Sequence, residues 1–404
     1  MPSDEKKLRI LIAADTYPPD VNGAAVFCQR LARSMTAKGH EVHVAAARNE
    51  SGPDTVRHHE EAVVHRFRSY PAPTHEYYRL CPPWKVGPAM DRLLEEIRPD
   101  VVHVQCHYMV GKAAIDAAVR RRIRLVATNH FMPENLDPFL PFPAWFCRIV
   151  AKNSWRDMNR LMGQASVVTT PTPLAAETMR RKGGFDRVLP LSNGIDLNEY
   201  RLRPGETIEP APRPTVLFVG RLAVEKNVDV LIDAVAATDP QLDIGLDVVG
   251  DGEQRDLLSD RIVRLGLSDR VRMLGHVDDA ALRRAYLRAD VFCQPGTAEL
   301  QSLVSLEAMS AGRPVVLADA LALPHLVEEG RNGHLFVPGD PTDLAAKLES
   351  VIRLSPQERR RMGEHSRTMA RRHSIATTMD AFEAIYRGAD EVSLHQYTDD
   401  EPVD

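Results

Sequence analysis

The sequence predicts an α/β protein with two doubly wound, Rossmann-like domains that face each other across a cleft. Its 404 residues exceed one ordinary hydrophobic core and suit two domains of about 150–200 residues each. In both halves, short apolar runs typical of strands alternate with helix-like stretches, which is the order of a parallel sheet. Proline and charged residues concentrate at 201–215, where they indicate a linker.

The first half opens with the repeating unit of a parallel sheet. A strand at 8–14 is followed by a loop, a helix and a second strand at 41–47. Further apolar runs lie at 100–105, 124–130 and 166–171, each separated from the next by a helix-like stretch. We therefore expect one parallel sheet covered by helices.

The second half repeats this plan after the linker. Its apolar runs lie at 215–221, 246–252, 271–275, 290–295 and 313–319. Ligands of such sheets bind at the carboxyl ends of the strands. The loops that leave these strands are therefore where functional residues are expected.

Bulk composition narrows the class of protein. Hydrophobic residues make up 44% and charged residues 26%, as in soluble globular proteins, and a net charge of -5 offers no general attraction to nucleic acid. No apolar stretch approaches the roughly 20 residues of a membrane span, and the N-terminus lacks the layout of a signal peptide. The five cysteines are scattered without a CxxC pair, so we expect free thiols and no metal site. These features favour a cytoplasmic protein.

Two glutamates flank a helix start in the segment TAELQSLVSLEAM. Glu299 falls on a loop that leaves a strand, whereas Glu307 falls inside a helix. Between them, the first backbone N–H groups of that helix, at Ser302, Leu303 and Val304, offer an anion site. A nucleotide sugar, with hydroxyls at both ends and phosphates in the middle, matches this order. The alternative is that both glutamates are merely solvated.

Three other loops that follow strands carry residues that could contact a phosphate or a sugar. Gly220 ends a strand, and Arg221 and Lys226 follow within reach of a diphosphate. Gly23 stands close to a helix start, where a small residue lets a phosphate or sugar approach the backbone. His130 also follows a strand. Each has an ordinary explanation as well: surface charge, a helix-entry glycine and a structural histidine.

These loops together resemble those of the family-four glycosyltransferases of the GT-B fold. The resemblance rests on YPPDVNGA, TNHF, SNGID, VGRLAVEKN, VGDGE, LGHV and the Glu-x7-Glu segment that leads into LEAMSAGRPVV, and it spans residues 8–385. It implies a metal-independent, retaining hexosyltransferase. The Glu-x7-Glu segment reads ELQSLVSLE where many relatives have Gly-Phe-Gly after the first glutamate, which is closer to the lipid (diacylglycerol) glycosyltransferases.

The resemblance also implies a role for each residue. Glu299 would bind hydroxyls of the donor sugar and Glu307 the ribose, while Arg221 and Lys226 would neutralise the leaving diphosphate. His130 would line the sugar and help to stabilise an oxocarbenium-like transition state. Further residues expected at the donor are Gly23, Ala24 (where relatives have a second glycine), Gly220, Gly250, Ser302, Leu303 and Val304. No cofactor is expected, and a UDP-sugar is favoured over a GDP-sugar as the donor.

The chain is expected to divide into five segments. These are an N-terminal acceptor-binding domain at 1–198, a linker at 199–214, a C-terminal nucleotide-sugar-binding domain at 215–370, a C-terminal helix at 371–390 that crosses back to the N-terminal domain, and an acidic tail at 391–404.

A basic segment at 145–162 bears on the acceptor. Arg148, Lys152, Arg156 and Arg160 recur every four residues beside aromatic residues that include Trp155, and would form a basic stripe along a helix. Such a helix suits an anionic membrane surface, at the inner face of the plasma membrane, where each basic group contributes about 1 kcal/mol. The alternative is an amphipathic helix packed on the sheet with a solvated charged face.

Three functions therefore stay open. The first is sugar transfer to a membrane lipid such as diacylglycerol. The second is the same transfer to a soluble acceptor, such as a sugar, a polyol or a natural-product aglycone. The third is a nucleotide-sugar binding protein without turnover.

Overall fold

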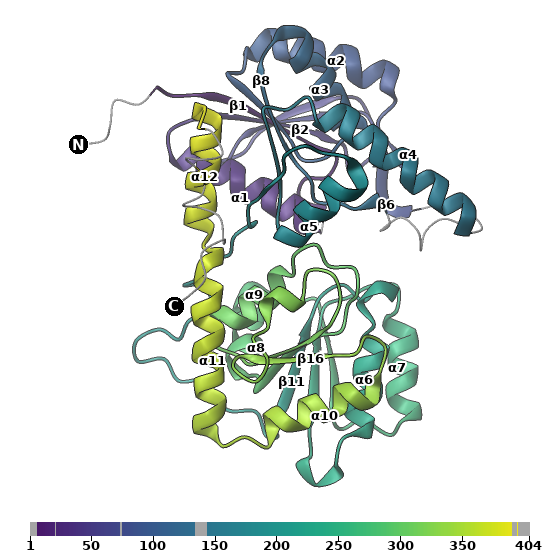
Figure 1. Cartoon of the computed structure of the whole chain (residues 1–404), viewed down its shortest axis with the longest axis vertical. Helices are drawn as coiled ribbons and strands as arrows, with labels where there is room; N and C mark the ends of the chain where they lie inside the picture. Colours follow the sequence, from purple (N-terminus) through teal and green to yellow (C-terminus); the bar gives the residue numbers. More distant parts are fainter. Residues whose placement is uncertain (1–5, 21, 73–74, 134–143, 390–393, 395–404) are drawn as a thin grey trace. The chain divides into compact units, whose positions relative to one another are not determined.

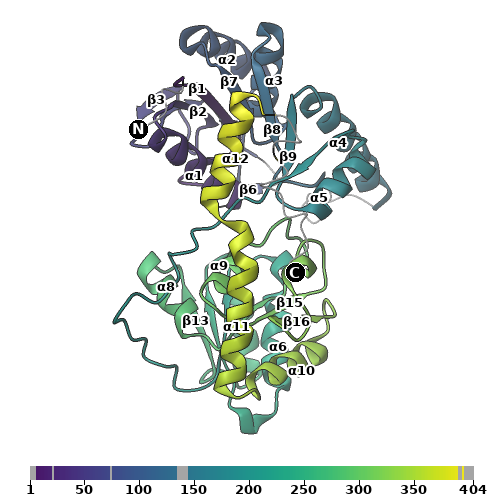
Figure 2. The same cartoon turned by 60° about the vertical axis from the view of Figure 1, so that its left-hand side comes forward.

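The computed structural model divides into two compact units, the first formed by 1–192 with 377–404 and the second by 193–376. Each unit has a largely parallel sheet with helices on both faces (Figures 1 and 2). The two Rossmann-like α/β domains expected from the sequence are confirmed. The structure describes residues 6–20, 22–72, 75–133, 144–389 and 394.

The sheet of the first unit has eight strands in the order β10-β9-β8-β7-β1-β2-β4-β3. All neighbours pair in parallel except β3 and β4. Its central strands are mostly apolar because both faces are covered, and Ile10, Leu11 and Ile12 are fully buried. The strands are β1 (Arg9–Ala14), β2 (Glu41–Ala47), β3 (Thr55–His58), β4 (Val63–Phe67), β7 (Val101–Val104), β8 (Arg124–Thr128), β9 (Val167–Thr170) and β10 (Leu189–Pro190), with a separate hairpin of β5 (Tyr70–Ala72) and β6 (His75–Leu80).

Helices connect these strands, as a parallel sheet requires. The first begins after Asn22, whose side chain caps it by accepting a hydrogen bond from the backbone N–H of Ala25 at 2.9 Å. The helices are α1 (Gly23–Ala37), α2 (Pro83–Ile97), α3 (Met109–Arg121), α4 (Ala144–Met162), α5 (Pro173–Thr178), the π-helical turn η2 (Met179–Gly183) and α12 (Ile375–Arg387).

The C-terminal helix α12 packs against the first unit. The hydroxyl of Tyr386 lies 2.6 Å from Nδ1 of His103 in β7, and the ring of Phe382 lies 5.7 Å from that of Phe27 in α1. All four side chains are buried. Helix α12 therefore completes the core that the first 192 residues begin.

The sheet of the second unit has six parallel strands in the order β13-β12-β11-β14-β15-β16. The strands are β11 (Thr215–Val219), β12 (Gly245–Val249), β13 (Val271–Gly275), β14 (Val291–Gln294), β15 (Val315–Ala318) and β16 (Gly333–Phe336). The helices are η3 (Val224–Lys226), α6 (Val228–Ala237), η4 (Pro240–Leu242), α7 (Arg255–Arg264), α8 (Asp279–Arg288), α9 (Leu303–Ser310), η5 (Pro324–Leu326), α10 (Pro341–Ile352), α11 (Pro356–Ala370) and η6 (Arg371–His373).

The structure bears on the expected linker, the acidic tail, the cysteines and the possibility of a membrane span. Residues 199–214, expected as a linker, lie within the second unit, where Glu206 accepts hydrogen bonds from Arg283 of α8 at 2.6 Å. The acidic tail at 391–404 lies, apart from Leu394, outside the described residues. All five cysteines are free, as predicted. Among the described helices, none is both long and apolar enough to cross a membrane.

An ion cluster anchors α12 to the C-terminal end of α1. Glu383 is held by Lys38 at 2.8 Å and by Arg387 at 2.8 Å. Burial alone would raise the pKa of Glu383, but the hydrogen bonds from Lys38 and Arg387 outweigh it and lower the pKa to about 2. Because the folded pKa is depressed, this stabilisation is present above the pKa of the unfolded chain and is lost as the pH falls toward the folded value.

We predict that Glu383→Gln destabilises the first unit by about 2 kcal/mol at neutral pH, since hydrogen bonds to charged groups are lost. The deficit relative to wild type should shrink between roughly pH 4.5 and pH 2, where the wild-type carboxylate also becomes protonated. Urea unfolding at several pH values measures this. Glu95→Gln, at a 70% exposed carboxylate paired with Arg121, is the control and should cost much less. A pH-independent deficit would contradict the charge-based explanation.

Candidate functional site

The carboxyl edge of the second sheet brings together two loops that the sequence singled out. β11 pairs in parallel with β14, with Val216 opposite Val291, so the two strands end side by side. The loop after β11 carries Lys226 and the loop after β14 carries Glu299, and their side chains form an ion pair. The main chains of the two loops also meet, because the N–H of Thr297 donates to the carbonyl of Glu225 at 3.2 Å.

The pairing of Lys226 with Glu299 was not expected from the sequence, which suggested that each faces a ligand separately. Only 22% of the Lys226 side chain and 12% of the Glu299 side chain are exposed, so solvent screens the pair weakly. The carboxylate thereby positions the ammonium group at the strand ends. An anionic ligand there would compete with Glu299 for the same cation.

Arg221 has acidic neighbours as well. Its Nη2 donates to Oε1 of Glu225 at 2.5 Å, and its Nη1 lies 3.9 Å from a carboxylate oxygen of Glu253. The two cations of this edge therefore stand among three carboxylates, the third being Glu299. Local ion pairs of this kind hold cationic side chains in place before a ligand arrives.

Helix α9 begins where the sequence placed it. Ser302 is its N-cap, with the hydroxyl accepting a hydrogen bond from the N–H of Ser305 at 3.4 Å, and Leu303 is its first residue. The N–H groups of the first turn, including those of Leu303 and Val304, have no partner inside the helix and lie at the positive end of the helix dipole. This arrangement favours an anion.

Glu307 lies inside α9, as predicted, and is 8% exposed. The hydroxyl of Tyr286 in α8 donates to its Oε2 at 3.0 Å. Burial and the adjacent carboxylate raise the pKa of Tyr286 well above its ordinary value, so the phenol stays protonated and keeps donating. Sequence reasoning missed Tyr286, since a tyrosine in an amphipathic helix reads as a core residue.

Gly250 has a packing role. A Cβ atom there would lie 1.9 Å from the carbonyl oxygen of Gly220, and φ is +129°. Both facts require glycine, because the ends of β11 and β12 approach too closely for a side chain. The two glycines thus allow the loops of this edge to come together.

Gly23, Ala24 and His130 belong to the first unit, at the carboxyl edge of its own sheet. Gly23 and Ala24 are the first two residues of α1, and nothing lies within 4 Å of where a Cβ on Gly23 would stand. The ring of His130, which follows β8, lies 5.0 Å from that of Phe27. Its Nε2 lies 2.8 Å from Oε1 of Gln105.

The imidazole of His130 is neutral at physiological pH, because burial lowers its pKa to about 4. Since the amide oxygen of Gln105 can only accept, Nε2 carries the proton. Gln105 was not predicted as a site residue. The alternation in VVHVQ, which sets His103 and Gln105 on one side of a strand end, is the signal that could have identified it.

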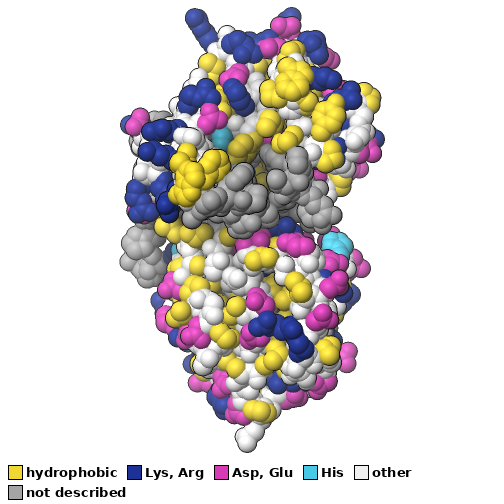
Figure 3. Space-filling model, turned by 90° about the vertical axis from the view of Figure 1, so that its right-hand side faces the viewer, with side chains coloured by type: hydrophobic (Ala, Val, Ile, Leu, Met, Phe, Trp, Pro, Cys, Tyr) yellow, Lys and Arg dark blue, Asp and Glu magenta, His cyan; other side chains and the backbone are white. Residues whose placement is uncertain are grey.

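The basic stripe on α4 is confirmed as an exposed surface. Arg148, Lys152, Arg156 and Arg160 are all exposed. Trp145, which is 58% exposed, and Ile149, which is 49% exposed, lie on the same side of the helix, since each is three residues before a member of the stripe. Figure 3 shows a face of the first unit on which large hydrophobic side chains gather beside lysine and arginine side chains.

Trp155 does not belong to this exposed face, contrary to the sequence-based expectation. It is 4% exposed and shares the buried side of α4 with Cys147 and Met158, which are eight and three residues away. A Cβ on Gly183 would lie 3.0 Å from the indole of Trp155, which shows how closely the ring packs against η2. Trp155 is therefore a core residue that helps to hold α4 on the unit.

Comparisons with known proteins agree with this geometry. A family model described as "Glycosyltransferase Family 4" matches residues 21–199, and one described as "Glycosyl transferases group 1" matches 204–369. The chain is 31% identical over 385 residues to a GDP-mannose-dependent alpha-mannosyltransferase of Mycolicibacterium smegmatis, covering 92% of this chain and 94% of the relative. It is 36% identical over 166 residues to a phosphatidyl-myo-inositol mannosyltransferase of Mycobacterium leprae, covering 40% and 44%.

Among solved structures, the fold is similar to that of HepE from Anabaena in complex with UDP-glucose. The TM-score is 0.71 at 23% identity, and the match covers 95% of this chain and 100% of that one. At this level of identity the similarity concerns the fold, which has the GT-B architecture expected from the sequence.

We predict that Gly250→Ala lowers the stability of the second unit by about 3 kcal/mol or more, because the new methyl group overlaps the carbonyl of Gly220 and the backbone must shift. Gly266→Ala is the matched control: φ is also positive there, at +67°, but nothing lies within 4 Å of the added Cβ. It should lose only about 1–2 kcal/mol of backbone strain. Thermal unfolding measures both variants, and equal losses would refute the close-approach explanation.

Proposed function

Because the chain belongs to glycosyltransferase family 4, we propose that it transfers a hexose from a nucleotide diphosphate sugar to a membrane lipid such as diacylglycerol, with retention of the anomeric configuration. The use of a nucleotide sugar follows from the family. The observation that carries the lipid acceptor is the exposed basic and aromatic face of α4.

On the donor side, the diphosphate binds at the carboxyl edge of the second sheet. Arg221 and Lys226 exchange part of their contact with Glu225 and Glu299 for the phosphate oxygens, and the N-terminus of α9 adds its dipole. As the bond between the sugar carbon and the phosphate oxygen breaks, these groups neutralise the growing negative charge on the leaving group. In this proposal no metal ion is required for that step.

The two glutamates bind the neutral ends of the donor. Once the diphosphate draws Lys226 away, Glu299 is free to accept hydrogen bonds from sugar hydroxyls, while Glu307, oriented by Tyr286, accepts from the ribose. The support for this division is their spacing on either side of the α9 N-terminus. The order of carboxylate, backbone amides and carboxylate matches the order of hydroxyls and phosphates in the donor.

His130 acts as a neutral hydrogen-bonding group toward the sugar. With Nε2–H directed at Gln105, its Nδ1 is the nitrogen available as an acceptor. The departing phosphate takes the proton of the acceptor hydroxyl as the new carbon–oxygen bond forms on the same face of the sugar. Protons are thus conserved without a separate pair of acid and base carboxylates.

The proposed donor is a UDP-sugar, whose base is uracil. The printed name of the mycolicibacterial relative contains GDP-mannose, whereas HepE was solved with UDP-glucose, so both classes belong in a binding panel. Thermal stabilisation by UDP-sugars and by GDP-mannose decides between them. A shift with the GDP-sugar alone would overturn the uridine assignment.

The lipid side of the proposal rests on charge and apolar exposure together. Among the described residues, no carboxylate ion-pairs with Arg148, Lys152 or Arg156, and Trp145 and Ile149 stand beside them. Unpaired cations attract an anionic leaflet, and an exposed indole with an aliphatic neighbour inserts at the interface.

A soluble acceptor is the second candidate, and one observation favours it. Arg160, the last member of the stripe, donates to Asp157 on the same helix at 2.5 Å. Ion pairs between residues three apart are typical of a helix face exposed to water, which needs no membrane to neutralise its charge.

We predict that Lys226→Ala and Glu299→Ala each lower turnover by about 100-fold or more, because a group that stabilises leaving-group charge, or the group that positions it, is removed. The measurement is the rate of sugar release or transfer from the donor, with thermal unfolding to confirm an intact fold. Lys347→Ala is the control, since this lysine pairs with Glu329 elsewhere in the same unit. Turnover at the wild-type rate in either site variant would remove that residue from the proposed mechanism.

We predict that neutralising three cations of α4 weakens binding to vesicles containing phosphatidylglycerol by about 100-fold, at about 1 kcal/mol for each charge. Flotation with and without anionic lipid measures this. The variant is Arg148→Gln with Lys152→Gln and Arg156→Gln.

Its control removes the same total charge elsewhere on the first unit and should bind vesicles like the wild type. That control is Arg33→Gln with Arg57→Gln and Arg122→Gln. If the wild-type protein does not float even with anionic vesicles, the lipid acceptor is abandoned in favour of a soluble one. Donor hydrolysis in the same samples keeps this outcome separate from any failure of the transferase assignment.

A further inference from the structure

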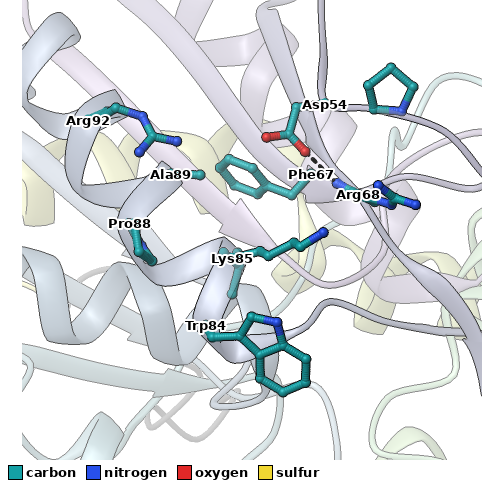
Figure 4. Close-up of a pocket in the computed structure, with 10 residues that line it drawn as sticks. Asp54, Phe67, Arg68, Trp84, Lys85, Pro88, Ala89 and Arg92 are labelled. Atoms are coloured by element: carbon teal, nitrogen blue, oxygen red, sulfur yellow. Dashed lines mark hydrogen bonds between the residues drawn. The ribbon is translucent and has the colours of Figure 1, made fainter.

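A pocket of about 390 Å³ opens in the first unit, between the loop after β2 and the start of α2. Its apolar wall includes Phe67, the last residue of β4, and Trp84 in the first turn of α2 (Figure 4). Its volume falls in the range of small-molecule sites. Because β4 runs parallel to β2, Phe67 marks the carboxyl edge of the sheet, where ligands of α/β folds bind.

The pocket is separate from the residues considered so far. His130 follows β8, and the sheet order places four strand spacings between β8 and β4, about 19 Å at about 4.8 Å per spacing. None of the ten residues that line the pocket was singled out by the sequence. Nothing in the proposed donor chemistry uses them.

Three cations line the pocket, and they are Arg68, Lys85 and Arg92. In the part of the chain that the structure describes, no carboxylate pairs with any of the three. The one carboxylate of the lining, Asp54, accepts instead from the main-chain N–H of Arg68 at 2.7 Å. The guanidinium of Arg68 lies 5.4 Å from the ring centroid of Tyr70, which orients it by a cation–π contact.

An exposed indole stands beside this charge. Trp84 is 76% exposed, the highest value among the large hydrophobic side chains of the described residues. Leaving such a ring in water forgoes the free energy of burying it, so an organic group that covers it is stabilised by contact. Arginine and lysine together bind phosphate oxygens, the former in a planar fork and the latter as a point charge.

We propose that this pocket binds an organic phosphate ester, with the phosphate held by Arg68, Lys85 and Arg92 and the organic part resting on Trp84. The chemistry is shared by a free polyol or sugar phosphate and by the head group of a phospholipid. The site is distinct from the donor site, and this proposal does not depend on the proposed transferase reaction.

The test follows the three tryptophans by ¹⁹F NMR of the full chain labelled with 5-fluorotryptophan. Trp84→Phe assigns the Trp84 resonance. Titration with sn-glycerol 3-phosphate should shift that resonance saturably, while glycerol, the uncharged counterpart, should not. The resonance of buried Trp155 should stay in place and reports on the fold.

Charge variants show whether the pocket is responsible. Arg68→Gln and Arg92→Gln should each weaken binding about 10-fold, which is about 1.4 kcal/mol. Arg33→Gln, on the exposed side of α1, should leave the affinity unchanged. If Arg68→Gln and Arg92→Gln both bind at wild-type strength, the ester is held elsewhere and the proposal is overturned.

Bicelles with and without phosphatidylglycerol distinguish the two sources of the ester. A Trp84 shift with the soluble ester supports a free ligand, and a shift only with anionic bicelles supports a lipid head group. Both outcomes uphold phosphate-ester binding. No response of Trp84 to either probe, or the same response to glycerol or to bicelles without phosphatidylglycerol, would overturn it.

Discussion

The hydrogen bonding of β11 between β12 and β14 is the constraint on which the second unit depends. All three strands run in parallel, so they end at one edge and their loops leave side by side. Because residue 250 is a glycine, the end of β12 can lie against the carbonyl oxygen of Gly220 at the end of β11. The pairing of β11 with β14 brings the loop of Arg221 and Lys226 beside the loop of Glu299.

Sequence reasoning succeeded where the signals were local. The start of α9 at Leu303 could be predicted because Pro295 and Gly296 break the preceding segment and Ser302 is a good N-cap. The strands were found because buried parallel strands are short, continuous apolar runs. The family resemblance then assigned the fold, and the structure confirmed both Rossmann-like units.

The failures concern contacts between residues distant in the sequence and the side of a helix on which a residue falls. Lys226 and Glu299 are 73 residues apart, and no local pattern says that they pair. Trp155 was grouped with its basic neighbours by proximity, although its spacing from Met158 places it on the core side of α4. The pocket at Trp84 is lined by a loop, a strand end and a helix from separate parts of the sequence, so only the folded structure reveals it.

Charge is used differently in the two units. At the carboxyl edge of the second sheet, Arg221 and Lys226 each have a carboxylate partner. Such pairing lowers the attraction for a stray anion and favours a ligand that replaces several contacts at once. In the first unit, such partners are lacking among the described residues for Arg148, Lys152 and Arg156 on α4 and for the three cations around Trp84. Their attraction for anions is therefore long-ranged and weakened by salt.

The chain crosses between the units twice, after Ser192 and after Ala376, so the second unit is inserted within the first. This has a consequence for biosynthesis. Residues of α1 and β7 leave the ribosome before the second unit, yet most of the helix that covers Phe27 and His103 is translated only after that unit. The inserted unit, contiguous in sequence, can fold as soon as it emerges. Until α12 is made, the nascent first unit exposes the apolar surface that this helix covers. During this interval the chain is most prone to aggregation and most in need of chaperones.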